Sequence, residues 1–191
     1  MESLRNREYI PGSSRMNYPE WCLFPRHLSA PNWVEEFAKI VEKNQKVINS
    51  AEHNKFDSDE VLKALEKDLE NIGWEIETGK KDIQKIFRPV LYGDKGKTRV
   101  SYEIDGWHSE HKIVLEIESG RGWMGNAFYR DLIRTSIIQD ADYLILGMRL
   151  SYSYGKVKNQ NDYAKAKEQL DAIYASGKLT LPFKGILLFG W

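Results

Sequence analysis

The chain has 191 residues, of which 41% are hydrophobic, and its 28 basic side chains equal its 28 acidic ones in number. This composition excludes a disordered chain and a protein that coats nucleic acid without specificity, and the single cysteine, Cys22, excludes a disulfide framework and a multi-cysteine zinc site. No apolar run approaches the roughly 20 residues of a membrane-spanning helix, so we expect a cytoplasmic protein with no membrane partner.

The first third of the sequence predicts an extended arm followed by helices. Residues 1–31 are rich in proline and aromatic residues, which favours extended segments without regular elements. Apolar residues recur at three- and four-residue spacing over 32–49 and 58–72, which predicts two helices. We therefore expect an N-terminal arm with a helix over 1–55 and a core domain over 56–191. The arm could supply a dimer interface, cover the sheet, or belong to one compact fold.

The remaining sequence predicts strands and helices of an α/β fold. Residues 74–77 alternate as a half-buried strand does, and 83–92 either continue the sheet or form an irregular basic loop. Residues 98–105 and 112–118 predict an antiparallel hairpin connected by 106–111. Helices over 126–140 and 161–175 each precede an apolar run, 143–149 and 183–189, that is typical of a strand covered on both faces. The order predicts a mixed β-sheet flanked by helices on both faces.

Charge is distributed unevenly along this core. Residues 57–77 contain eight acidic and two basic side chains, whereas residues 80–99 contain seven basic and two acidic ones. One interpretation is two ordinary solvated faces. The other is a basic lip beside an acidic metal-binding floor.

Carboxylates are concentrated in the predicted hairpin. Residues two apart in a strand share a face, so Glu103 lies beside Asp105 and Glu116 beside Glu118. If the hairpin closes between them, the carboxylates converge, and each raises the pKa of the others unless a cation is bound. Oxygen-only ligation selects Mg²⁺ or Mn²⁺. The alternative is an amphipathic hairpin whose exposed acids pair with nearby bases.

The run Asp105, then Glu116-Ile117-Glu118 on the following strand, resembles the PD-(D/E)xK nuclease superfamily. An acid-bearing helix precedes this run and a helix and an apolar strand follow it, so the resemblance covers residues 56–149. It implies a restriction-endonuclease-like fold in which Asp105 and Glu116 bind the metal. Glu118 stands where the family usually has lysine, and it would assist the metal or the attacking water. Family members often add an acid from the preceding helix, and Glu66 is our choice.

Basic side chains near the acids are candidate phosphate contacts. Arg121 lies in a glycine-rich segment before the predicted helix, which permits close approach of a phosphate. Two further arginines follow at four-residue spacing on that helix, where they either grip the DNA backbone or form salt bridges with Asp131. The predicted nucleic-acid-binding residues are Arg121, Arg130, Arg134, Lys80 and Lys81.

Together these features predict a metal-dependent endodeoxyribonuclease that hydrolyses DNA phosphodiester bonds, with a type II restriction endonuclease as one form. The metal is the only cofactor expected. A homodimer is one possible arrangement, because enzymes that cut both strands usually need two subunits. The alternative is a catalytically inactive module that binds nucleic acid or protein on the same fold. A metal hydrolase acting on a small substrate is a third hypothesis, which the basic stretch disfavours.

Overall fold

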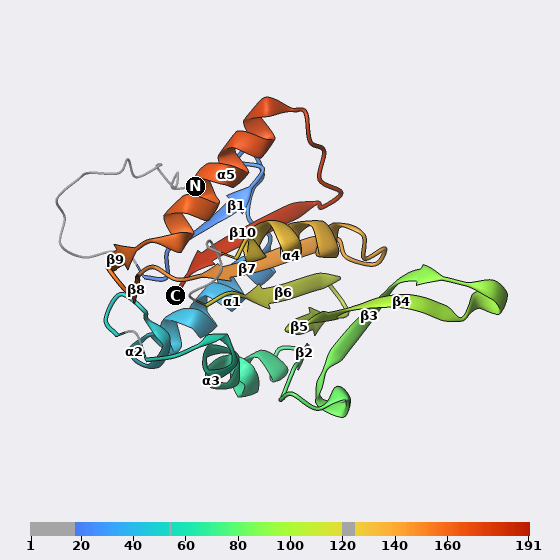
Figure 1. The fold of residues 1–191 in the computed structure, drawn as a ribbon, viewed down its shortest axis with the longest axis horizontal. Helices are drawn as coiled ribbons and strands as arrows, with labels where there is room; N and C mark the ends of the chain where they lie inside the picture. The colour runs from blue at the N-terminus through green and yellow to red at the C-terminus, as the bar shows by residue number, and fades with distance from the viewer. Residues whose placement is uncertain (1–17, 54, 120–124) are drawn as a thin grey trace, which may run out of the picture.

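The computed structural model describes residues 18–53, 55–119 and 125–191. A six-stranded sheet in the order β1-β10-β7-β6-β5-β2 forms the centre of the molecule (Figure 1). Its strands are β1 (Trp21–Phe24), β2 (Trp74–Ile76), β5 (Gly106–His108), β6 (Ile113–Ile117), β7 (Tyr143–Met148) and β10 (Gly185–Gly190). Strands β6, β7 and β10 run parallel, and β1, β5 and β2 pair antiparallel. The predicted α/β class with a mixed sheet is confirmed.

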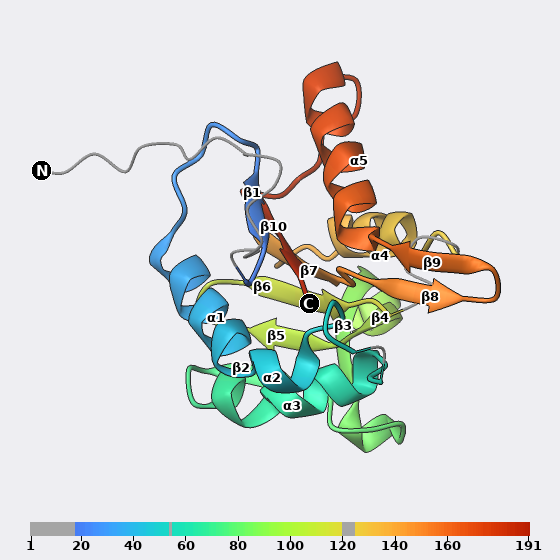
Figure 2. The ribbon, with the colours of Figure 1, turned by 90° about the vertical axis from the view of Figure 1, so that its left-hand side faces the viewer.

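Helices cover both faces of the sheet, as Figure 2 shows. On one face lie α1 (Asn32–Lys43), α2 (Gln45–Ile48) and α3 (Ser58–Glu70); on the other lie α4 (Ala127–Ser136) and α5 (Asp162–Ser176). Alternate side chains of the central strands enter the two cores, so that Ile145 packs with α1 and α3 while Leu144 packs with α4 and α5. The fully apolar sequence of β7 follows from this burial on both faces.

Two local predictions in the N-terminal part were wrong. Residues 21–24, expected to be irregular, form edge strand β1, in which Leu23 pairs with Leu187 of β10. The helix predicted over 32–49 is two helices separated at Asn44, whose side-chain amide donates to the carbonyl of Ile40 at 3.0 Å and to Asp68 Oδ2 at 3.0 Å. The domain boundary placed at residue 55 stays a prediction.

The hairpin predicted from 98–105 and 112–118 was also wrong. Strand β4 (Thr98–Ile104) pairs instead with β3 (Ile86–Tyr92), and the two form a separate arm that projects from the body (Figure 1). The partner of β6 is β5, in the segment that had been expected to be a connection. Gly106 permits this pairing, because a Cβ there would lie 3.0 Å from Ile76 Cδ1 and 3.2 Å from Leu115 Cβ. Asp105 is consequently the junction between the arm and the sheet.

The remaining elements are short. Two 3-10 turns, η1 (Asp82–Gln84) and η2 (Asp94–Gly96), flank β3, and β8 (Tyr152–Tyr154) pairs with β9 (Val157–Gln160) in a second hairpin. None of the helices in the described residues is both long enough and apolar enough to cross a bilayer.

Candidate active site

Asp105 is held in place by the backbone of two neighbouring strands. Its carbonyl accepts a hydrogen bond from the amide of Glu77, just after β2, at 2.9 Å, and its carboxylate Oδ2 accepts one from the amide of Ile117 in β6 at 2.7 Å. Burial raises the pKa of Asp105 to about 7, against the lowering effect of the Ile117 hydrogen bond. Asp105 is therefore a preoriented carboxyl group that is costly to ionise in the absence of a cation.

Glu116 and Glu118 lie at the carboxyl end of β6. Leu115 and Ile117, which alternate with the two glutamates, face α1 and α3, so Glu116 and Glu118 face the α4 side of the sheet. The amide of Glu118 donates to the carbonyl of Gly147 at 2.8 Å, which continues the parallel pairing with β7. Burial and the neighbouring Asp105 charge raise the pKa of Glu116 well above its ordinary value. The charges of Asp105 and Glu118 both contribute to the raised pKa of Glu116, so these three carboxyl groups influence one another.

A fourth carboxyl group, Asp131 of α4, completes this cluster and is 1% exposed. The carboxyl groups of Glu118 and Asp131 are close enough to share a hydrogen bond; burial and this bond raise the pKa of Glu118 to about 9. The Arg130 guanidinium donates from Nε to Asp131 Oδ1 at 2.8 Å and from Nη2 to Glu118 Oε1 at 2.6 Å. A proton and an arginine therefore balance the two carboxyl groups.

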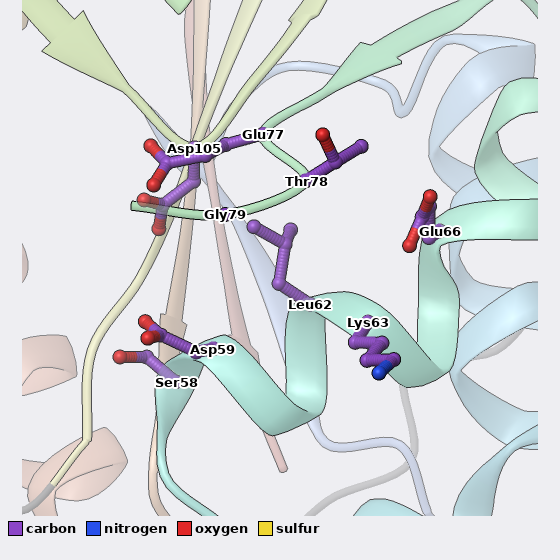
Figure 3. A pocket seen from close by; sticks show the side chains of 9 residues that line it. All are labelled: Ser58, Asp59, Leu62, Lys63, Glu66, Glu77, Thr78, Gly79 and Asp105. Carbon is purple, nitrogen blue, oxygen red and sulfur yellow. The ribbon is translucent and has the colours of Figure 1, made fainter. Parts of the chain in front are cut away.

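Glu77 and Asp105 both line a cavity of about 140 Å³ at the N-terminal end of α3. Figure 3 shows the side chains of Glu77 and Asp105 side by side, with their carboxyl groups pointing the same way. Burial, followed by the charge of Glu103, raises the pKa of Glu77, and the Glu77 charge in turn raises the pKa of Asp105. Glu77 is therefore a member of the acidic cluster.

Glu66, the helix acid suggested by the resemblance, lines the same cavity as Asp105. Its carboxyl group lies at the opposite end, beyond Leu62 and Thr78 (Figure 3). Glu103, which was expected to share a face with Asp105, is part of β4. Its Oε1 forms an ion pair with Nζ of Lys85 at 2.6 Å. It lies in the arm because β4 pairs with β3.

The basic residues expected to contact nucleic acid have different environments. Arg130 forms the ion pair with Asp131 that was its alternative interpretation, and a second one with Glu118 that was not expected. Lys80 Nζ lies 3.5 Å from Asp59 Oδ2. Arg134 donates to the carbonyl of Glu103 at 3.3 Å and stacks over the ring of Tyr102. Lys81 is exposed, and Arg121 falls outside the described residues.

A hard divalent cation fits the chemistry of these donors. Asp105 and Glu116 offer carboxylate oxygens, and burial, with a further contribution from neighbouring acidic groups, raises the pKa of both, so a bound cation would stabilise their ionised forms. Across residues 18–53, 55–119 and 125–191, no three acidic, histidine or cysteine side chains are already spaced as a coordination sphere. Mg²⁺ requires fewer protein ligands than that, since it keeps several waters and binds through one or two carboxylates. Asp105 and Glu116 are the residues that would hold it.

The sequence contains a signal for one of the two acids that were missed. Asp131 follows Phe128 by three residues and precedes Leu132, so it lies on the buried face of its helix, where an ionisable side chain is unusual. Glu77 gave no such signal, because its position depends on the pairing of β2 with β5.

Comparison with solved structures identifies a protein with a similar fold. No protein-family model and no curated protein matches the sequence. Among solved structures, the restriction endonuclease BglII complexed with a DNA 16-mer aligns with 90% of this chain and 75% of its own, with a TM-score of 0.52 and 13% identity. Free BglII aligns with 90% of this chain and 78% of its own, with a TM-score of 0.46 and 12% identity. The chain has a restriction-endonuclease-like fold.

Proposed function

We propose that this protein is a metal-dependent endodeoxyribonuclease, with a type II restriction endonuclease as its specific form, and that Mg²⁺ or Mn²⁺ is its cofactor. The observation that carries the proposal is the cluster of Asp105, Glu116 and Glu118 at the carboxyl end of β6, on a restriction-endonuclease-like fold. The cluster combines a motif of the PD-(D/E)xK type with groups whose ionisation is suppressed. Groups with such perturbed pKa values are concentrated at functional sites.

In this proposal Asp105 and Glu116 hold the cation. A bound Mg²⁺ would supply Lewis acidity toward the phosphodiester and would favour ionisation of a water near neutral pH. The Ile117 amide orients the Asp105 carboxylate, so little rearrangement of that side chain is required on binding. Binding displaces protons from the acids, since only the ionised carboxylates are ligands.

Glu118 takes the place of the usual lysine, and its environment suits it for proton transfer. With a pKa raised to about 9 by burial and by Asp131, it is protonated at neutral pH when no cation is bound. A cation nearby would lower that pKa toward neutrality, where a carboxyl group exchanges protons most effectively. Glu118 would then accept a proton from the attacking water or donate one to the leaving 3′ oxygen.

A second candidate function is a non-catalytic module that binds nucleic acid or protein. The observation that favours it is the ion pair between Glu118 and Arg130, which occupies one candidate catalytic group. Such a module would retain the fold and would bind DNA without cutting it.

Cleavage of supercoiled plasmid in Mg²⁺ or Mn²⁺ tests the proposal. We expect nicked and linear products from the unmodified protein and a loss of at least about 100-fold in rate for Asp105→Asn and Glu116→Gln, because each removes a metal ligand. Glu70→Gln, an exposed acid on the same helix as Glu66, is the matched control and should cut normally. Binding of plasmid without cutting in either metal would favour the non-catalytic module.

A further inference from the structure

The β3–β4 arm is a two-stranded ribbon that extends away from the body of the protein (Figure 1). Its base is fixed: Ile104 is 1% exposed within the α4–α5 core, and the Arg88 guanidinium lies 3.9 Å from the centre of the Trp107 ring. Its outer part is open to solvent, with every residue from 94 to 101 exposed. The arm is thus an anchored projection with a free end.

The arm is positively charged from Arg88 to Ser101. Residues 88–101 contain four basic side chains and one acidic side chain, a net charge of +3. Because the whole chain is neutral, the rest of the molecule carries a net charge of −3. The basic residues are Arg88, Lys95, Lys97 and Arg99.

This charge is not compensated by neighbouring carboxylates. In the part of the chain that the structure describes, Lys95, Lys97 and Arg99 form no ion pair. Two basic residues nearer the active-site acids are paired, Lys80 with Asp59 and Lys85 with Glu103. The end of the arm therefore carries three exposed basic side chains, Lys95, Lys97 and Arg99, within five consecutive residues and without an ion pair in the described part of the chain.

The shape and charge of the arm together indicate which class of molecule binds it. Leu91 and Tyr92, consecutive residues of β3 that are 48% and 51% exposed, show that the outer part of the ribbon is not covered by the body of the protein. A second copy of the chain placed arm to arm would bring two positive ends together, which is unfavourable. A polyanion is attracted by the same charge, and a two-stranded β-ribbon fits the major groove of B-DNA, which is about 12 Å wide. A seven-residue strand is about 23 Å long, sufficient to reach along the groove.

We propose that the β3–β4 arm is a DNA-binding element that lies in the major groove of duplex DNA, with Lys95, Lys97 and Arg99 contacting backbone phosphates. This inference rests on the proposed function, in which DNA is the substrate. It assigns DNA binding to a segment distinct from the acidic cluster. The arm holds the duplex while the acids at the other end of β4 face the bond to be cut.

The test is the salt dependence of binding to a fluorescent 20-base-pair duplex, measured by anisotropy in EDTA so that no cutting occurs. The triple variant Lys95→Ala/Lys97→Ala/Arg99→Ala removes three phosphate contacts. In a plot of log affinity against log salt concentration, each phosphate contact contributes about −0.9 to the slope. When salt rises from 50 to 200 mM, the affinity of the unmodified protein should therefore fall by a factor about 40 times larger than the factor for the triple variant.

A matched control separates position from net charge. Lys39→Ala/Lys46→Ala/Lys178→Ala removes three exposed lysines from α1, α2 and the segment after α5, and changes the net charge equally. It should retain the salt dependence of the unmodified protein. Thermal unfolding of both variants should match that of the unmodified protein, because all six side chains are exposed.

The proposal is overturned if the arm variant and the control variant bind the duplex equally well. It is also overturned if the arm variant changes the oligomeric state in light scattering while its DNA affinity is unaltered, since the arm would then contact a second copy. Its failure is distinguishable from failure of the proposed function. A protein that cuts plasmid with an unimportant arm is still a nuclease, whereas one that binds through the arm and never cuts is not.

Discussion

Nη2 of Arg130 lies 2.6 Å from Oε1 of Glu118, the residue that the proposed function places at the position of the motif lysine. A positive charge is therefore adjacent to position 118 although the residue itself is acidic. The same guanidinium binds Asp131, which is almost fully buried. The ion pairs connect α4 to the end of β6 and fix the side chain of Glu118 in the absence of a cation.

Replacing Arg130 should destabilise the metal-free protein. Arg130→Gln leaves two buried carboxyl groups without a cation, at a cost of about 1–3 kcal/mol because the arginine itself is half exposed. For a chain of this size each kcal/mol lowers Tm by roughly 2–4 °C. Thermal unfolding at pH 7.5 in EDTA measures the change. Arg26→Gln breaks an exposed pair with Asp171 and should lower Tm by no more than about 2 °C.

Glu77 and Glu66 should differ in their importance for cleavage. Glu77 lies beside Asp105, whereas Glu66 lies at the far end of the cavity. Glu77→Gln should therefore reduce the rate of plasmid cleavage at least 10-fold, in the range of a residue that orients a metal ligand. Glu66→Gln should change it less than threefold. The opposite ranking would assign the helix acid to the metal site, as the resemblance alone suggested.

The stability of the metal-free protein should fall as pH rises. The folded-state pKa of Asp105 is about 7 and that of Glu118 about 9, both above the values of unfolded chains. Between about pH 4 and 9 the folded state therefore binds more protons than the unfolded state, and the free energy of unfolding decreases with pH. Urea unfolding at pH 5, 7 and 9 in EDTA measures this slope.

Two comparisons identify the origin of that slope. Asp105→Asn keeps an acceptor for the Ile117 amide and removes one negative charge, so it should be more stable than the unmodified protein at pH 8 and should show a weaker decline between pH 4 and 7. Mg²⁺ should raise Tm more at pH 8 than at pH 5.5, because protons compete for its ligands. Stability that is constant or rises across this range would contradict the electrostatic description of the cluster.

The sheet itself can be tested at Gly147 of β7. A Cβ at this position would lie 2.6 Å from Cζ of Phe189, whose ring is fully buried and packs edge-on against Phe37 at 5.1 Å. Gly147→Ala should destabilise the protein by about 1–3 kcal/mol through overpacking. Gly93→Ala, where the nearest atoms are 3.7 Å away, should be neutral. Urea unfolding of both variants decides whether β7 and β10 pack as described.

The sequence by itself determined the types of most elements and singled out Asp105, Glu116 and Glu118 as candidate site residues. Helices α3, α4 and α5 and strands β7 and β10 were predicted because burial on one or two faces leaves a periodic pattern in neighbouring residues. Asp105 and Glu116 were selected from the spacing of carboxylates in neighbouring predicted strands and from the resemblance to the PD-(D/E)xK superfamily, and their role in metal binding stays a prediction. These features depend on residues a few positions apart, so they can be read without a structure.

Only the tertiary structure decided which strands pair and which charges meet. Strand β4 pairs with β3 instead of β6, and this pairing places Glu103 in the arm beside Lys85. Gly106 of β5 leaves the space that the side chains of Ile76 and Leu115 occupy. The acidic cluster also contains Glu77 and Asp131, which come from other segments of the chain than Asp105. Arg130 of α4 pairs with Glu118 at the end of β6. Such contacts are decided by packing and register across the whole fold, and local periodicity carries no record of either.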